Sequence, residues 1–306
     1  MRATASYSSL AAVLVSSLLA SPAPAQQSDS SASPLAHIAW VAGPAIAQLG
    51  DVAELRVPES CRFTDAKGAR QFMEATHNPP SDAELGVLLC RNVADSTRWF
   101  VVFEYNAVGL VKDDEKTSLD QAAILKTIRS GTEAGNEERR ERGWAEIEVT
   151  GWQRAPYYDS LTHNLTWATR LRRKHAPDDV TVNHSVRLLG RGGVMNADLV
   201  ADPAQMESAV ADFDAILTNY SFVSGQRYSE WRKGDKIAEY GLTALIAGGA
   251  GVAAAKLGLF GKLWKLILYA ALALKKLIIV AVVGVAGFVK RLFGRKDDDT
   301  APQPQG

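Results

Sequence analysis

Residues 161–171 read LTHNLTWATRL and residues 181–189 read TVNHSVRLL, and these two stretches decide the fold that the sequence predicts. Both are rich in β-branched and aromatic residues, and both alternate apolar with polar side chains, as half-buried strands do. The segment between them is short and polar, so we expect a hairpin with residues 172–179 as its loop. Strands joined by a hairpin are antiparallel, which favours an antiparallel sheet.

The rest of the central region adds strands and helices that do not alternate as regular βαβ units. Strands are predicted at 85–89, 98–105, 144–152 and 194–200. Helices are predicted after the capping residues Thr64, Ser118 and Asp202, with a separate helical run at 133–142. We therefore expect residues 35–236 to form an α+β domain, an antiparallel sheet with helices packed on it.

The N-terminus has the pattern of a secretory signal peptide in residues 1–25. Arg2 provides the positive charge, Leu10–Ala20 is an apolar stretch too short to cross a bilayer, and Ala23-Pro24-Ala25 fits a signal-peptidase site. A membrane anchor that is not cleaved is the alternative. Residues 26–34 are polar and rich in serine, so we expect a disordered leader.

The C-terminal region has the pattern of a membrane anchor. Residues 237–260 are predicted to be a transmembrane helix, because Leu242–Phe260 contains a single charge, Lys256. Small residues recur every four positions at Ala247, Gly251 and Ala255, a spacing that permits self-association in lipid. Residues 261–296 are predicted to be a basic amphipathic helix or a second membrane segment, and residues 297–306 a disordered tail.

The charge distribution points to a lipid bilayer as partner and away from nucleic acid. The chain has 34 Lys and Arg against 34 Asp and Glu. Residues 26–236 hold 24 basic and 30 acidic residues, whereas residues 237–306 hold nine basic and four acidic ones. A basic tail beside an apolar segment is typical of membrane proteins, and the positive-inside rule then favours a single pass with the main domain outside the cytoplasm.

Two histidines give the sharpest hypothesis for a site. His163 and His184 each fall on the apolar face of a predicted strand, and the hairpin would bring those two faces to the same side of the sheet. Together with Asp159 they could hold a metal ion. The alternative is two histidines at the edge of the core, each satisfied by hydrogen bonds. No sequence motif predicts a cofactor.

Cys61 and Cys90 are the two cysteines of the chain. A disulfide between them would close a loop of about 30 residues and stabilise an exported domain by roughly 3 kcal/mol. Two buried free thiols are the alternative.

Several long motifs resemble an uncharacterised bacterial family, domain of unknown function 2167. They include WFVVFEYNAVGLVKDDE (99–115), GWQRAPYYDSLTHNLTWA (151–168), VNHSVRLLGRGGVM (182–195) and DKIAEYGLTALIAGGAGVAAAK (235–256). The resemblance covers most of residues 50–296 and implies a membrane-anchored envelope protein of a Gram-negative bacterium. It supplies no catalytic residue, ligand or partner.

The sequence therefore favours a non-enzymatic binding or scaffolding domain, periplasmic and held at the inner membrane by one pass. The alternative is a metal-dependent enzyme or binder that uses His163 and His184. The protein partner is left open.

Overall fold

The structure is a computed structural model, and it describes residues 34–91 and 98–248. These residues belong to a compact unit that ends at Ala253. The predicted signal peptide, the tail and everything predicted from residue 249 onward lie outside the described residues.

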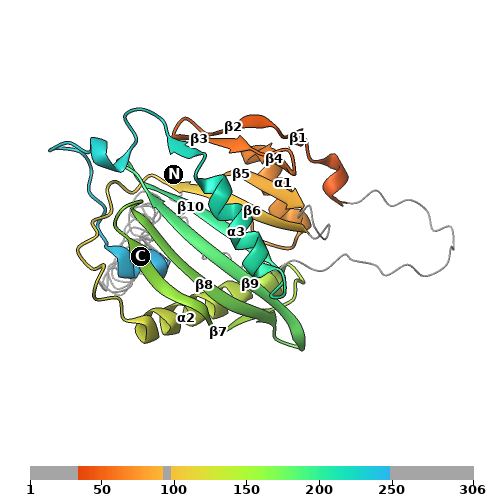
Figure 1. The fold of residues 1–306 in the computed structure, drawn as a ribbon. Helices are drawn as coiled ribbons and strands as arrows, with labels where there is room; N and C mark the ends of the chain where they lie inside the picture. The colour runs from red at the N-terminus through yellow and green to blue at the C-terminus, as the bar shows by residue number, and fades with distance from the viewer. Residues whose placement is uncertain (1–33, 92–97, 249–306) are drawn as a thin grey trace, which may run out of the picture. The chain divides into compact units, whose positions relative to one another are not determined.

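An eight-stranded antiparallel sheet forms the centre of this unit (Figure 1). Its spatial order is β1-β4-β5-β6-β10-β9-β8-β7. A smaller antiparallel sheet has the order β11-β3-β2. The predicted antiparallel α+β architecture is confirmed. In chain order, the strands are β1 (Val41–Ala42), β2 (Ala45–Leu49), β3 (Ala53–Val57), β4 (Cys61–Asp65), β5 (Glu84–Arg91), β6 (Arg98–Asn106), β7 (Ile147–Asp159), β8 (Asn164–Arg173), β9 (Ala176–Leu189), β10 (Val194–Ala201) and β11 (Tyr220–Phe222).

Helices occur close to where the sequence predicts them, but their caps differ. They are α1 (Ala66–Ala75), α2 (Gln121–Glu141), α3 (Met206–Leu217) and the short α4 (Leu242–Ile246), with 3-10 turns η1 (Pro34–His37) and η2 (Tyr228–Glu230). Asp65 and Asp120 cap α1 and α2 by accepting backbone N–H bonds from Gly68 and Ala123, each at 3.0 Å. The predicted caps Thr64 and Ser118 were therefore wrong.

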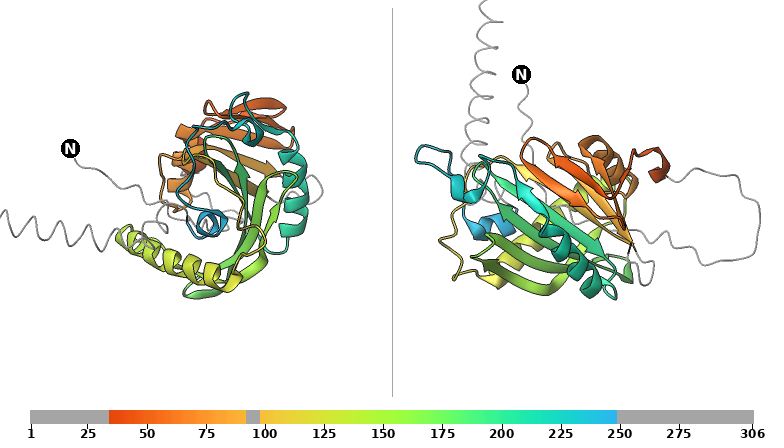
Figure 2. Two further views of the ribbon diagram at one scale, coloured as in Figure 1. Left: turned by 90° about the vertical axis from the view of Figure 1, so that its left-hand side faces the viewer. Right: turned by 45° about the horizontal axis from the view of Figure 1, so that its top comes forward.

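Both faces of the large sheet are covered, and three clusters of buried hydrophobic residues form the contacts. The outer face packs against α3 and the three-stranded sheet. The inner face packs against α1 at one end and against α2 and α4 at the other. The left view of Figure 2 shows the sheet curving, with α4 on the inside of the curve and α3 outside it. Because both faces are covered, polar residues on the central strands can lie within the protein on either face.

Residues 237–248, where the predicted transmembrane helix at 237–260 begins, pack with this domain. Leu242 and Ile246 are 0% exposed and pack in one cluster with α2. The helix ends at Ile246, and Gly248 has a φ of 116°, in the left-handed region.

Of the predicted small-residue face, Ala247 alone lies within the described residues, where it is 7% exposed. Gly251 and Ala255 lie outside the described residues. Within residues 34–91 and 98–248, no helix has the length and apolar character needed to span a bilayer.

Candidate functional site

The inner face of the sheet carries polar residues at its centre, where the three strands β6, β10 and β9 run side by side. Antiparallel pairing places Glu104 of β6 opposite Asn196 of β10, and Asn196 opposite Arg187 of β9. In the next row, Asp198 of β10 lies opposite Ser185 of β9. Side chains alternate between faces along each strand, so all five point to the same side.

This polar centre faces a cavity of about 770 Å³. Its floor is the central sheet, and its walls are α1, the loop that precedes β5, α2 and the end of α4. The apolar lining includes Met73 of α1, Val102 of β6 and Ile128 of α2. A cavity of this size with a few convergent polar groups is typical of a site for a small molecule.

Asp198 accepts hydrogen bonds from two donors. Ser185 Oγ donates to Asp198 Oδ1 at 2.5 Å, and Arg187 Nη1 donates to the same oxygen at 3.0 Å. The Arg187 side chain is 5% exposed, and its guanidinium lies 4.7 Å from the centre of the Trp167 ring. A buried ion pair that is hydrogen-bonded and stacked in this way has one preferred geometry, which makes this part of the cavity rigid.

Glu104 has a different environment. Its nearest donor is Asn196 Nδ2, 3.4 Å from Glu104 Oε2, which is a long hydrogen bond. Burial first, and then the nearby charges of Asp198 and Glu84, raise the pKa of the Glu104 carboxyl to about 7. The Oδ1 atom of Asn196 is buried and has no hydrogen-bond partner among the described residues. The cavity therefore contains hydrogen-bond acceptors that the protein does not saturate.

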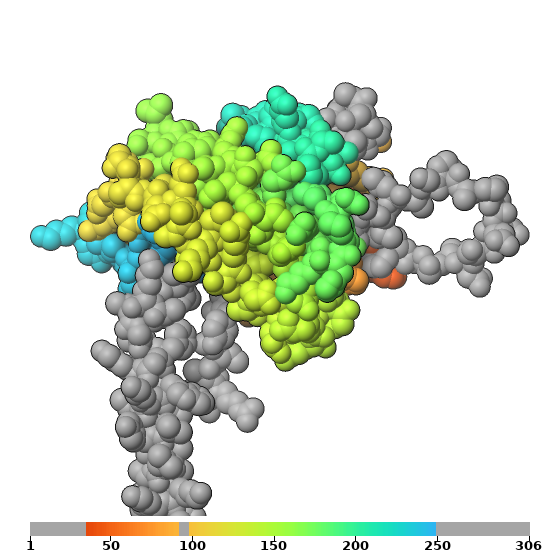
Figure 3. Space-filling view, turned by 90° about the horizontal axis from the view of Figure 1, so that it is seen from below, coloured from red at the N-terminus to blue at the C-terminus, as the bar shows by residue number. Residues whose placement is uncertain are grey.

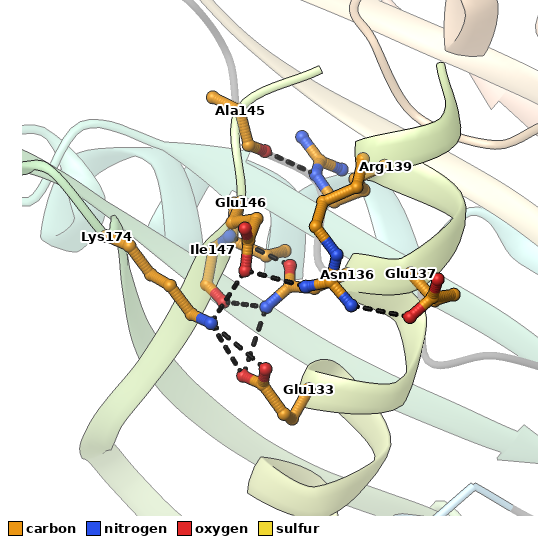
Figure 4. A network of polar contacts seen from close by, with 9 residues as sticks. Glu133, Asn136, Glu137, Arg139, Ala145, Glu146, Ile147 and Lys174 are labelled. Carbon is orange, nitrogen blue, oxygen red and sulfur yellow. Dashed lines mark hydrogen bonds and ion pairs between the residues drawn. The ribbon is translucent and has the colours of Figure 1, made fainter. Parts of the chain in front are cut away.

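The wall formed by α2 is fixed to the sheet by a polar network (Figure 4). Asn136 of α2 accepts from the Ile147 backbone N–H at 3.0 Å and donates to the Ile147 carbonyl at 2.9 Å. Arg139 Nε donates to the Ala145 carbonyl at 2.7 Å. Lys174 bridges Glu133 of α2 and Glu146. These contacts hold α2 against the beginning of β7, and Figure 3 shows this side of the domain.

Two glycines on α2 leave room in the cavity. Gly131 and Gly135 are one helical turn apart and both line it. A Cβ atom built at either position would meet nothing within 4 Å. Glycine in a helix interior costs about 0.5–1 kcal/mol relative to alanine, so packing does not explain these two residues. The cavity wall therefore has room for a larger side chain at both positions.

The structure does not bring the predicted metal ligands together. His163 lies in the turn between β7 and β8, with a φ of 55°, and not in a strand. Its Nδ1 is 3.1 Å from the Tyr158 hydroxyl, and its ring stacks on Tyr228 at 4.3 Å. Asp159 accepts hydrogen bonds from Leu161 N and Thr162 Oγ1 in the same turn, which lower the pKa of its carboxyl.

His184 lies on β9, directly opposite Ala168 of β8, five positions from His163 along the ladder. At about 3.3 Å per residue the two histidines are roughly 16 Å apart. His184 is 3% exposed on the outer face, and its ring meets that of Phe213 on α3. Nowhere in the described part of the chain do three or more His, Cys, Asp or Glu side chains form a group that could hold a metal ion.

The hairpin register explains this correction. The strands extend to Arg173 and Ala176, which are paired, so the loop is much shorter than the predicted 172–179. In this register even-numbered residues of β8 oppose even-numbered residues of β9. The apolar odd positions of β8 and the apolar even positions of β9 therefore lie on opposite faces of the sheet, and both faces are buried.

The two cysteines form a disulfide in the structure. Cys61 of β4 and Cys90 of β5 are paired residues in the antiparallel ladder, with Cα atoms 4.1 Å apart. The bond lies in the outer-face core, with Cys61 4% and Cys90 1% exposed, and it is remote in register from the polar centre.

Sequence reasoning missed the polar centre, although a signal was present. On β9 the odd positions Asn183, Ser185 and Arg187 are polar, and on β10 Asn196 and Asp198 occupy alternate positions. Such residues are normally assigned to a solvent face. Their placement in central strands of a sheet covered on both sides would have indicated a buried polar site.

The two solved structures described here are only weakly similar to the chain. The solution structure of cyanobacterial PsbP (CyanoP) from Synechocystis sp. PCC 6803 is 12% identical, covers 65% of this chain and 98% of its own, and has a TM-score of 0.32. The crystal structure of the Saccharomyces cerevisiae Ran-binding protein Mog1p is 13% identical, covers 64% and 99%, and has a TM-score of 0.31. Similarities this low establish neither fold nor function. No curated protein matches the chain.

The family comparison spans most of the chain. A model described as protein of unknown function (DUF2167) matches residues 42–286. This range includes every strand of the large sheet except the first residue of β1, and the four helices found in the described residues. The resemblance inferred from the sequence motifs is confirmed, and the chain belongs to the DUF2167 family.

Proposed function

We propose that this protein is a membrane-anchored envelope protein whose folded domain binds a small polar molecule in the inner-face cavity. The observation that carries the proposal is the group of charged side chains at the centre of the sheet, which face an open volume of about 770 Å³. Arg187 is buried, and Asp198 and Glu104 are partly buried. Burying charged groups costs free energy, and the fold does not require it at these positions. The opposite face of β10 presents Met195, Ala197 and Leu199, which pack without polar atoms.

The arrangement fits binding better than catalysis. Ser185 is the hydroxyl nearest to a carboxylate, but it donates its proton to Asp198, which is already paired with Arg187. A general base must be free to accept the proton of a nucleophile, and this carboxylate is held in an ion pair. The polar groups therefore position a ligand.

Two features support the envelope and the membrane anchor. A disulfide such as Cys61–Cys90 is typical of proteins exported to an oxidising compartment. The apolar and basic sequence beyond residue 248 has the composition of a membrane anchor. Protease added to bacterial spheroplasts that express the full chain should digest the domain. Protection of the domain until the membrane is broken would contradict a periplasmic location.

Binding can be tested by thermal unfolding of the full chain in detergent micelles. The panel consists of 1,4-diaminobutane, L-arginine, L-glutamate, glucose and inorganic phosphate. A ligand at a hundred times its Kd adds about 2.7 kcal/mol and should raise the unfolding midpoint by several degrees.

A matched pair of variants on α2 then locates the site. Gly135→Met extends a side chain into the cavity and should abolish the shift, because the added atoms meet open space there. Ala134→Met makes a similar change at an exposed neighbour outside the cavity and should keep the shift. Equal shifts in the two variants, or no shift with any member of the panel, would contradict the proposal.

A further inference from the structure

The charges around Glu104 restrict what the cavity can hold. Glu104 of β6 lies opposite Glu84 of β5 in the ladder and close to Asp198 of β10. Glu84 is 1% exposed, and both its carboxylate oxygens accept from the Ser81 N–H, at 2.7 and 2.9 Å. Two carboxylates, those of Glu104 and Asp198, thus line the cavity, and the charge of Glu84 acts on Glu104 from beside it.

The positive charges nearby do not neutralise both carboxylates. Arg187 of β9 is paired with Asp198. Arg70 of α1 lies near Glu84, where its charge lowers the carboxyl pKa against the larger effect of burial. On the α2 side, Arg139 and Glu138 line the wall with opposite charges, and Asp82 adds an acid from the loop before β5. The charge of Arg187 also lowers the pKa of the Glu104 carboxyl, against the larger effect of burial, but its hydrogen bond goes to Asp198. An ionised Glu104 therefore has no ion pair of its own among the described residues.

Beside Glu104, the buried polar atom without a hydrogen-bond partner among the described residues is an acceptor. The amide nitrogen of Asn196 is directed to Glu104, so the atom left without a partner is the acceptor Oδ1. Asn196 is 8% exposed and lines the cavity beside Glu104. A ligand that satisfies both residues must donate hydrogen bonds, and one that carries positive charge also restores electroneutrality.

We propose that the cavity binds a small organic cation through a protonated primary amine, which donates to the Glu104 carboxylate and to Asn196 Oδ1. This inference rests on the proposed function and names the chemical class of its ligand. An ammonium group has three donors and needs fewer charged ligands than a divalent metal ion, which fits an environment of one unpaired carboxylate and one amide oxygen.

Binding of this kind is linked to protons. The carboxyl of Glu104 is partly protonated near neutral pH, and the amine binds its ionised form. Affinity should therefore rise about tenfold between pH 6 and pH 8 and then level off until the amine itself loses its proton. At pH 6 the protein should release close to one proton for each ligand bound.

Calorimetric titration of the full chain in micelles tests the proposal with 1,4-diaminobutane, and with 1,4-butanediol as a neutral ligand of the same length. We expect the diamine to bind at least tenfold more tightly than the diol. At pH 6 its apparent heat should differ between buffers of different ionisation enthalpy. Glu104→Gln should weaken diamine binding at least tenfold and remove the pH dependence. Asp212→Asn removes one exposed carboxylate on α3, beyond the other face of the sheet, and should change neither.

The possible outcomes separate the two proposals. Equal binding of diamine and diol, or binding of glucose, glutamate or phosphate but not of diamine, would overturn the inference on ligand class and leave the cavity as a binding site. Tight diamine binding that Glu104→Gln does not weaken would also overturn it. Failure of every probe would overturn both. The comparison of diamine with diol needs no variant, so it remains decisive if a substitution impairs folding.

Discussion

Glu104 and His184 lie on opposite faces of the same sheet, and their surroundings shift their pKa values in opposite directions. Burial, Asp198 and Glu84 raise the pKa of Glu104 to about 7. Burial first, and then the charge of Arg154, lower the pKa of His184 to about 4. In each case the folded protein favours the neutral form of the side chain.

The two shifts affect stability with opposite signs over nearly the same pH range. The Glu104 pKa is higher in the folded state, so its contribution to stability is present below about pH 4.5 and is lost as pH rises to about 7. The His184 pKa is lower in the folded state, so its contribution is present above about pH 6.5 and is lost as pH falls to about 4. Each effect amounts to at most about 3 kcal/mol, and in the native chain they largely cancel.

Single substitutions should therefore separate them. His184→Leu keeps an apolar side chain against Phe213 and leaves Glu104 in place. The free energy of unfolding of this variant should therefore rise as the pH falls from 7 to 4.5. For Glu104→Gln, the free energy of unfolding should fall as the pH falls over the same interval. His175→Gln, at an exposed turn position, is the control and should follow the native chain. Denaturant unfolding at several pH values measures these slopes, and parallel curves for all three variants would refute the assignment.

At the scale of single elements, the cavity depends on how α2 is fixed to β7. Asn136 satisfies both backbone groups of Ile147 from a fully buried position. Asn136→Ala leaves a buried N–H and a buried carbonyl without partners and should lower the free energy of unfolding by about 2–3 kcal/mol. Ser130→Ala removes an exposed hydroxyl that bonds only within α2 and should cost less than about 0.5 kcal/mol. Equal costs would show that the network does not anchor the helix.

The helices α1 and α2 also show which features local sequence rules can predict. Hydrophobic spacing predicted α1 and α2 because each helix buries one apolar stripe. The caps were misplaced by one or two residues, since Thr64–Asp65 and Ser118–Asp120 each offer more than one side-chain oxygen near the same end. The run 133–142 continues α2, because nothing at Gly131 forces the helix to end.

At the scale of the whole molecule, the site depends on strand order, which local rules do not give. Glu104 and Asn196 are 92 residues apart in sequence and meet because β6 pairs with β10 and not with β7. The two histidines of the metal hypothesis lie apart for a related reason. The sequence placed His163 and His184 on apolar faces of two adjacent strands, but only the register decides whether those faces coincide. The alternating polar residues of β9 and β10 indicate a buried polar site only when both faces of the sheet are known to be covered.

The boundary between the domain and the predicted membrane segment is also a property of the whole fold. Residues 237–248 are apolar enough to be assigned to a membrane span from sequence, yet α4 completes the inner-face core beside α2. Ile246 is 0% exposed, so Ile246→Ala should lower the free energy of unfolding of the domain by about 2–5 kcal/mol.

Ile237→Ala makes the same chemical change at a side chain that is 40% exposed, so its cost should be clearly smaller. Unfolding of the full chain in micelles, followed by tryptophan fluorescence, measures both. If Ile246 belonged to a lipid-facing helix, its substitution would leave the unfolding of the domain unchanged, and the domain would then end before α4. A large cost at Ile246 with a small one at Ile237 places the end of the ligand-binding fold beyond α4, so that any membrane anchor begins after the wall of the cavity is complete.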